Sequence, residues 1–134
     1  MVLATKNDLE KIKPKIASAW VKDWMSELGR PVGDREEFRV LFERFLSEEL
    51  GFAEVVAVSI DSNELDIKIE NCVICPGNDL LRAQGAPTLC PILLTGLMAI
   101  NRVLRMRPTL LGVDKRGTGF CTIKYAIAPG SSAP

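Results

Sequence analysis

The four cysteines are the residues of this 134-residue chain whose type and spacing point most directly to chemistry. Cys72 and Cys75 form a C-x-x-C pair, and Cys90 and Cys121 follow as single residues. Cysteine thiolates bind zinc with tetrahedral geometry, and a C-x-x-C turn supplies two ligands at a suitable separation. The sequence therefore predicts one metal site formed by Cys72, Cys75, Cys90 and Cys121, with zinc as the metal.

Two other interpretations of the cysteines remain open. Cysteine often acts as a small buried apolar residue, and Cys121, within an alternating strand pattern, fits that role. Alternatively, the thiolates hold an iron–sulfur cluster, or Cys72 and Cys75 form a redox-active pair. Against a thioredoxin-like motif, the C-x-x-C pair leads into a loop with Pro76 and Gly77, not directly into a helix.

The composition excludes several classes of function. The chain has no histidine, so it cannot contain Ser-His-Asp or Cys-His catalytic groups or a histidine-ligated zinc. Lys plus Arg and Asp plus Glu are balanced at 17 each, which argues against a general nucleic-acid binder. No glycine-rich nucleotide-binding turn is present. Together these observations favour a protein that is not an enzyme.

The sequence also bears on location. Its start shows no signal-peptide pattern, and it has no apolar run of about 18 residues. We therefore expect a cytoplasmic protein that does not span a membrane. In a reducing compartment stable disulfides are rare, which favours metal or redox chemistry for the cysteines.

Two helices are expected in the first half of the chain. In the first, apolar residues recur at three- and four-residue steps, at Leu9, Ile12, Ile16, Trp20, Trp24 and Leu28. We expect it to begin with a cap at Asn7 or Asp8, or near Pro14, since proline is tolerated in a first turn. The second helix is predicted from a cap at Asp34 to a stop at Gly51.

Two β-hairpins and a third helix follow. The apolar spacing changes to two residues over 56–60 and 65–69, which predicts the first hairpin. The third helix is predicted from Cys90-Pro91 to about Arg105, with Pro108 closing it. A second hairpin is predicted from strands at 110–113 and 121–127, joined by a turn at 115–119.

These elements define the expected fold. It is an α+β domain with an antiparallel sheet of about four strands packed against about three helices. Residues 1–128 are expected to form a single domain, and residues 129–134 a disordered tail. The aromatic residues of the first two helices stand at helical spacing and are expected to be core, namely Trp20, Trp24, Phe38, Phe42 and Phe45.

The segment from about residue 38 to 127 resembles a known family. The similarity lies in Glu49-Leu50-Gly51-Phe52, Glu70-Asn71-Cys72, Cys90-Pro91 with Gly96, and Gly119-Phe120-Cys121-Thr122-Ile123. These runs resemble the vinyl 4-reductase domain family of small-molecule-binding domains, which is related to TRAPP subunits and to nitric-oxide-sensing domains. The resemblance implies an α+β domain, often dimeric, with a pocket for hydrocarbon-like or aromatic ligands.

The resemblance also implies a zinc site in some members. In those members one cysteine precedes the long helix and another opens the last strand, and Cys90 and Cys121 match these positions. Aromatic-sensing members carry a Glu and a Cys on the strand after the long helix, whereas this chain has Leu110-Leu111-Gly112-Val113-Asp114. Cys72 and Cys75 are the candidates to replace those ligands.

The functional prediction combines these points. We expect a non-enzymatic domain that binds or senses a small apolar or aromatic ligand and carries a mainly structural cysteine-ligated metal. The ligand cavity is predicted between the helices and the sheet, near Phe42, Leu94, Leu97, Met98 and Tyr125. The alternatives are an iron–sulfur or thiol redox protein, and a homodimeric scaffold or assembly subunit whose third helix lies in the dimer interface.

Overall fold

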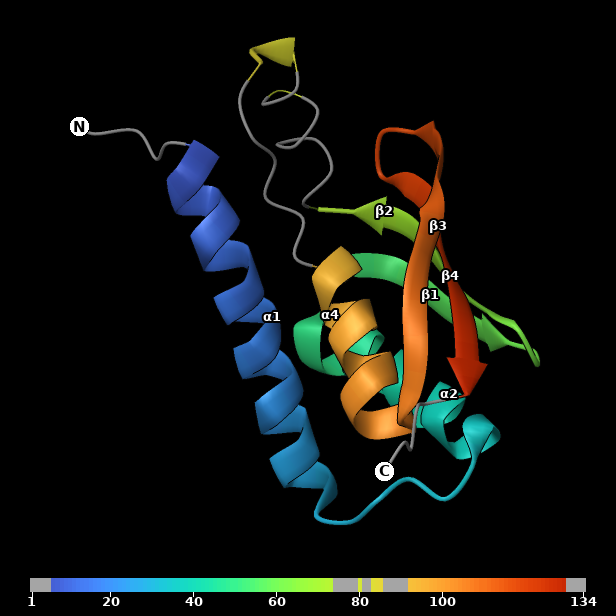
Figure 1. Ribbon diagram of the computed structural model, residues 1–134. Helices are drawn as coiled ribbons and strands as arrows, with labels where there is room; N and C mark the ends of the chain where they lie inside the picture. Colours follow the sequence, from blue (N-terminus) through green and yellow to red (C-terminus); the bar gives the residue numbers. More distant parts are fainter. Residues whose placement is uncertain (1–5, 74–79, 81–82, 86–91, 130–134) are drawn as a thin grey trace.

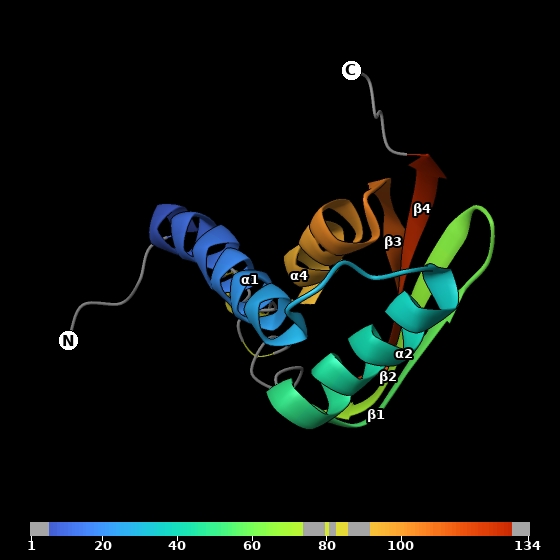
Figure 2. The same cartoon turned by 90° about the horizontal axis from the view of Figure 1, so that it is seen from below.

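The computed structural model describes residues 6–73, 80, 83–85 and 92–129, with side chains described from residue 11 onward. Within these residues, three α-helices pack on one side of a four-stranded antiparallel sheet, as the sequence predicted (Figures 1 and 2). The elements are α1 (Lys6–Leu28), α2 (Arg35–Arg44), the π-helix η1 (Phe45–Leu50), β1 (Ala53–Ile60), β2 (Glu64–Cys72), α4 (Ile92–Ala99), the π-helix η2 (Ile100–Leu104), β3 (Met106–Gly117) and β4 (Phe120–Pro129).

The first helix is longer than predicted at its N-terminal end. It begins at Lys6, so Pro14 lies inside it, and the predicted starts at Asn7, Asp8 or Pro14 are wrong. Proline has no N–H to donate to the carbonyl four residues earlier, which is costly in a helix interior. The helix nevertheless continues to Leu28, and its second half contributes Ala17, Val21 and Trp24 to the core.

The second helix begins and ends where the sequence predicted. The side chain of Asp34 accepts a hydrogen bond from the Glu37 N–H at 2.8 Å and so caps α2. Gly51, with a φ of +58°, ends the segment in the left-handed conformation that glycine adopts without steric cost. Between these points the sequence did not reveal that the last turns, Phe45–Leu50, form a π-helix.

Both predicted hairpins are present and lie in the sheet order β1-β2-β4-β3. The inner faces of β2 and β4 alternate as predicted, and Ile67 lies opposite Ile123 and Leu65 opposite Tyr125. The second hairpin is longer than predicted, because β3 pairs with β4 from Met106 onward.

The prediction that Pro108 closes the third helix is wrong. The helix ends at Leu104, where Arg105 adopts a φ of +60° and its N–H bonds to the Ile100 carbonyl. Pro108 instead lies in β3 opposite Ile127. β3 is an edge strand, and proline is tolerated there because an outward-facing N–H is not needed for pairing.

The core lies between the sheet and the helices. Figure 2 shows α4 between α1 and the sheet, while α2 runs along β1 and β2. Trp24 stacks on Phe45 with 4.9 Å between ring centroids, and Phe38 and Phe42 stack at 5.2 Å. The predicted core role of these four rings is confirmed, since all of them are buried. Among the described helices, none is both long and apolar enough to cross a membrane.

The edge of β1 is partly covered by α2. The N–H of Val58 donates to Glu43 Oε1 at 2.8 Å, and Arg39 Nη1 donates to the Val58 carbonyl at 3.4 Å. Arg39 and Glu43 also form an ion pair at 3.8 Å. Two side chains from one helix thus satisfy the outward-facing backbone groups of one residue in an edge strand.

Candidate functional site

Cys72 is the last residue of β2 and is buried, with 5% of its surface exposed. The alternation of β2 would not bury it, because Ile69 faces the core three positions earlier. Asn71 breaks the alternation, with a φ of +54°, and its Nδ2 donates to Glu54 Oε2 at 2.8 Å. This left-handed residue accounts for the position of Cys72 in the core.

Cys121 is the second residue of β4 and lies opposite Ile69 on the inner face of the sheet. It is half-buried and packs at the margin of the core. It also borders a surface hollow of about 140 Å³ whose lining includes Ile69, Lys68 and Arg116. The predicted apolar-face position of Cys121 is confirmed, and its side chain remains partly accessible.

The two cysteines lie at the same end of the sheet. The N–H of Cys72 donates to the Gly119 carbonyl at 3.2 Å, and Gly119 is two residues before Cys121. A Cβ at Gly119 would lie 3.3 Å from the Cys72 nitrogen, so this close approach requires glycine, whose φ is also +86°. The structure thus brings Cys72 to the turn that precedes β4, two residues before Cys121.

The other two predicted metal ligands, Cys75 and Cys90, lie outside the described residues. Within the described part of the chain, no group of three or more Cys, Asp or Glu side chains is close enough to hold a metal ion. Cys72 and Cys121 alone are too few for a closed tetrahedral site. The four-cysteine site therefore stays a prediction.

The predicted ligand residues have different environments. Tyr125 and Phe42 are fully buried in the core. Leu94, Leu97 and Met98 are half-buried on α4, and the last two pack against the core. The structure therefore places the first two inside the core and the other three along the partly accessible side of α4.

Tyr125 has a structural role that the sequence did not reveal. Its hydroxyl donates to the Leu93 carbonyl at 2.9 Å and also contacts the Ile92 carbonyl at 3.4 Å. Gly96, one turn later on α4, lies directly against the tyrosine ring. Gly96 gave a signal in the sequence as a glycine inside an apolar helix, which often marks close packing.

Two acidic side chains meet at a hollow of about 230 Å³ that Trp24 and Arg44 also line. Burial raises the pKa of Glu49 above its ordinary value of 4.5, and the neighbouring Glu27 carboxylate raises it further. Glu27 comes from α1 and Glu49 from η1, so this pair sits at the contact between two helices. The sequence gave no signal for it, since the two residues are far apart in the chain.

Sequence reasoning also missed a hollow of about 170 Å³ that three arginines border, Arg30, Arg102 and Arg105. In the sequence, Arg102 and Arg105 are recognisable only as basic residues near the C-terminal end of the predicted third helix. Their position suits the helix dipole, which was the signal the sequence offered. Apart from Val103, the apolar residues of this hollow come from α1 and the connection after it, which only the tertiary structure brings close to η2.

We compared the chain with known protein families, with curated proteins and with solved structures, and no match was found. The arguments for function therefore depend on the residues and contacts described above. The resemblance to the vinyl 4-reductase domain family stays an expectation from short sequence runs.

Proposed function

We propose that this protein is a non-enzymatic domain that binds a small apolar or aromatic ligand and is held together by a cysteine-ligated, mainly structural metal. The observation that supports the metal best is the position of Cys72 and Cys121 at one end of the sheet, where the Cys72 N–H bonds to Gly119. One cysteine comes from each hairpin, so a shared metal would join both hairpins.

Chain lengths are compatible with four ligands at this end of the sheet. Cys75 is three residues after Cys72, a separation of at most about 11 Å between Cα atoms. Cys90 is two residues before Ile92, the first residue of α4, whose carbonyl contacts Tyr125. Thiolate binding to zinc would contribute directly to folding free energy, which suits a structural role.

The surface beside α4 supports the ligand part of the proposal. Leu110 lies opposite Tyr125 and Val113 opposite Ile123, on the side of the sheet that faces the helices. They are nevertheless 39% and 45% exposed. With the half-buried Leu94 and Leu97 on α4, they provide apolar surface that the described core does not cover. A small apolar ligand would gain from covering it.

The metal is tested by elemental analysis of untagged protein together with a thiol count after denaturation. About one zinc per chain and four thiols would support the proposal. Cys121→Ser should lose the zinc, whereas Ile69→Val, which trims the residue opposite Cys121 without removing sulfur, should keep it. Iron with acid-labile sulfide would replace the proposal with an iron–sulfur protein. Absence of any metal would refute a metal site.

The ligand is tested with toluene as the probe in a methyl NMR titration. Saturable shifts of the Leu94, Leu97 and Met98 methyl signals are expected. Leu97→Asn should abolish them, whereas Leu111→Asn, a matched change on β3 that is not part of the predicted ligand site, should leave them unchanged. Unaltered methyl signals up to the solubility limit of toluene would contradict the ligand site.

A homodimeric scaffold is the second candidate, and one observation favours it. Leu110, Leu111 and Val113 form an exposed apolar run on β3. Such runs are often covered by a partner. Light scattering on a size-exclusion column distinguishes the cases, because a monomer at high concentration would count against the scaffold.

A further inference from the structure

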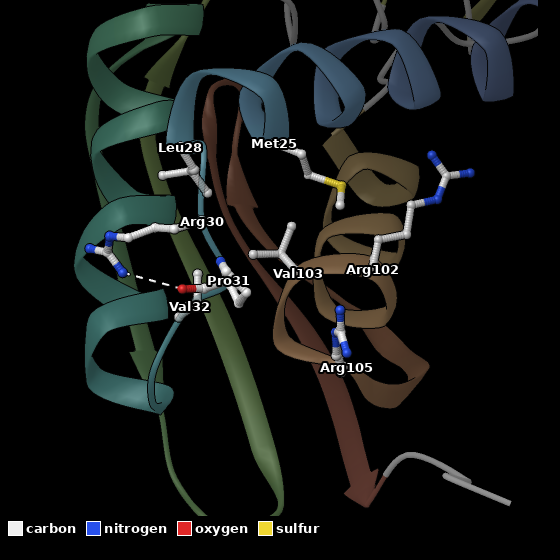
Figure 3. Close-up of a pocket in the computed structure, with 8 residues that line it drawn as sticks. All are labelled: Met25, Leu28, Arg30, Pro31, Val32, Arg102, Val103 and Arg105. Atoms are coloured by element: carbon white, nitrogen blue, oxygen red, sulfur yellow. Dashed lines mark hydrogen bonds between the residues drawn. The ribbon is translucent and has the colours of Figure 1, made fainter. Parts of the chain in front are cut away.

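A hollow of about 170 Å³ lies where the end of α1, the connection after it and η2 meet (Figure 3). Its floor is apolar and is formed by Met25, Leu28, Pro31, Val32 and Val103. Met25 and Leu28 come from α1, and Val103 comes from η2. The floor is only partly covered, and Met25 itself is 41% exposed.

Three arginines border this floor, and they differ in their partners. Arg30 is neutralised by a forked ion pair with Glu37, at 2.7 Å and 3.2 Å. Arg102 donates to the neutral Ser18 hydroxyl at 3.1 Å. Among the described residues, neither Arg102 nor Arg105 forms an ion pair, and no Asp or Glu lines the hollow. Within the described part of the chain, the positive charges of Arg102 and Arg105 therefore lie beside the apolar floor without a paired carboxylate.

The backbone at this place is unusual in two respects. η2 is a π-helix, a rare form that is frequent at functional sites. Arg105 adopts a left-handed φ of +60°, a conformation that glycine adopts at lower cost. A glycine would end the helix equally well, so the arginine side chain is the feature that distinguishes this position.

A structural explanation for the arginines also exists. They stand near the C-terminal ends of α1 and η2, where positive charge is favourable for the helix dipole. That explanation predicts a stabilising role and no ligand. It does not explain why an apolar hollow that no Asp or Glu lines lies beside the arginines.

We infer that this hollow binds a small carboxylate with a compact apolar group, such as an aromatic or short branched carboxylic acid. The carboxylate would accept hydrogen bonds from Arg105, whose guanidinium group has donors to spare, while Arg102, which points toward α1 (Figure 3), adds positive charge at the rim. The apolar group would cover Met25 and Val103. The volume is suitable, since a cavity of about 150 Å³ accommodates benzene. This site is separate from the ligand site proposed beside Tyr125.

The probe for this inference is benzoate, with neutral benzamide as its matched control. In a methyl NMR titration, benzoate should give saturable shifts at Met25, Leu28, Val32 and Val103, with a dissociation constant on the order of millimolar. Benzamide should bind about fivefold more weakly or worse, because it lacks the charge. Shifts confined to these residues separate this site from the toluene site at Leu94, Leu97 and Met98.

The decisive variant is Arg105→Gly, because it removes the guanidinium while relieving the left-handed backbone. We expect benzoate binding to weaken about fivefold or more, with the melting temperature unchanged or raised. Arg107→Ala, which removes a nearby charge that does not line the hollow, should leave binding unchanged.

Four results would overturn the inference. Benzoate could fail to shift the methyl signals of these four residues, or benzamide could bind as well as benzoate. Arg105→Gly could lower the melting temperature and leave binding intact, which would assign the arginine to the helix dipole. Shifts that depend on protein concentration without benzoate would also overturn it, because a second copy of the chain would then cover the hollow.

Discussion

The hydroxyl of Tyr125 lies in the space that a side chain at Gly96 would need. The same hydroxyl donates to the Leu93 carbonyl at 2.9 Å, so β4 and α4 are joined by one buried side chain. Tyr125 is fully buried, and the absence of a Cβ at position 96 allows the helix to approach the ring. The contact fixes the distance between the sheet and α4.

This contact predicts that Gly96→Ala destabilises the protein by about 1–3 kcal/mol, although alanine is the better helix former. Tyr125→Phe keeps the ring and removes the hydrogen bond, so it should cost about 0.5–1.5 kcal/mol. Gly117→Ala is the control, because nothing lies within 4 Å of a Cβ there. Urea unfolding measures the free energy of unfolding of all three variants. An unchanged value for Gly96→Ala would show that α4 moves freely to make room for the added methyl group.

Because Glu43 accepts a hydrogen bond from the edge of β1, Glu43→Ala should lower the free energy of unfolding. The variant removes the acceptor of the partly buried Val58 N–H, which should cost about 1–2 kcal/mol and speed hydrogen exchange at that amide. Glu36→Ala is the control, since Glu36 pairs with Arg39 but is 69% exposed, and it should destabilise the protein less than Glu43→Ala does. Equal exchange rates at Val58 in both variants would contradict this role of Glu43.

The lowered pKa of Glu37 predicts how the stability of the protein changes in acid. Hydrogen bonds from Arg30 and the Gly33 N–H hold its pKa below the ordinary value of 4.5. A carboxylate whose pKa is lowered in the folded state stabilises the fold at pH values above its unfolded-state pKa of about 4.5. This stabilisation is lost as the pH falls through the folded-state pKa. Glu37→Gln should therefore lower the melting temperature at pH 6, and the difference from the unmutated protein should shrink as the pH falls below about 4.5. Asp23→Asn, at an exposed position on α1 outside this ion pair, is the control for the loss of one acidic side chain.

Glu49 should behave in the opposite way. Burial and the neighbouring Glu27 raise its pKa, so its ionised form is disfavoured in the folded state. The penalty appears as pH rises above about 4.5 and is complete above the raised value. Glu49→Gln should raise the melting temperature slightly near pH 7 and not near pH 4. Asp114→Asn, at an exposed acidic residue on β3 that does not contribute to this shift, is the control for the loss of one negative charge, and an equal rise there would contradict a specific effect of Glu49.

Local patterns in the sequence predicted most of the fold. Alternation predicted the inner faces of β2 and β4, and the Asp34 cap and Gly51 stop predicted the limits of the second helical segment. Pro14 and Pro108 misled the prediction, since the penalties for proline are local. In α1, tertiary packing outweighs the lost hydrogen bond at Pro14. In β3, the edge position of the strand means that Pro108 loses no pairing hydrogen bond.

The candidate site was less predictable for a physical reason. Burial of Cys72 depends on a single left-handed residue, Asn71, which changes which face the next side chain occupies. Periodicity assumes regular backbone and cannot detect such a change. The arginine-bordered hollow combines α1 with η2, segments separated by most of the chain, so local patterns carry no information about it.

The two edge strands of the sheet determine how readily copies of the protein can pair through their sheets at high concentration. On β1, Arg39 and Glu43 occupy the hydrogen-bonding groups of Val58. On β3, Pro108 offers no N–H, and bulges near Gly112 and Arg116 interrupt the regular spacing. A neighbouring molecule cannot extend the sheet by adding a strand along either full edge, which opposes fibril growth. Leu111 and Val113 can thus stay exposed on a strand without templating aggregation, and any association through them must use side-chain packing.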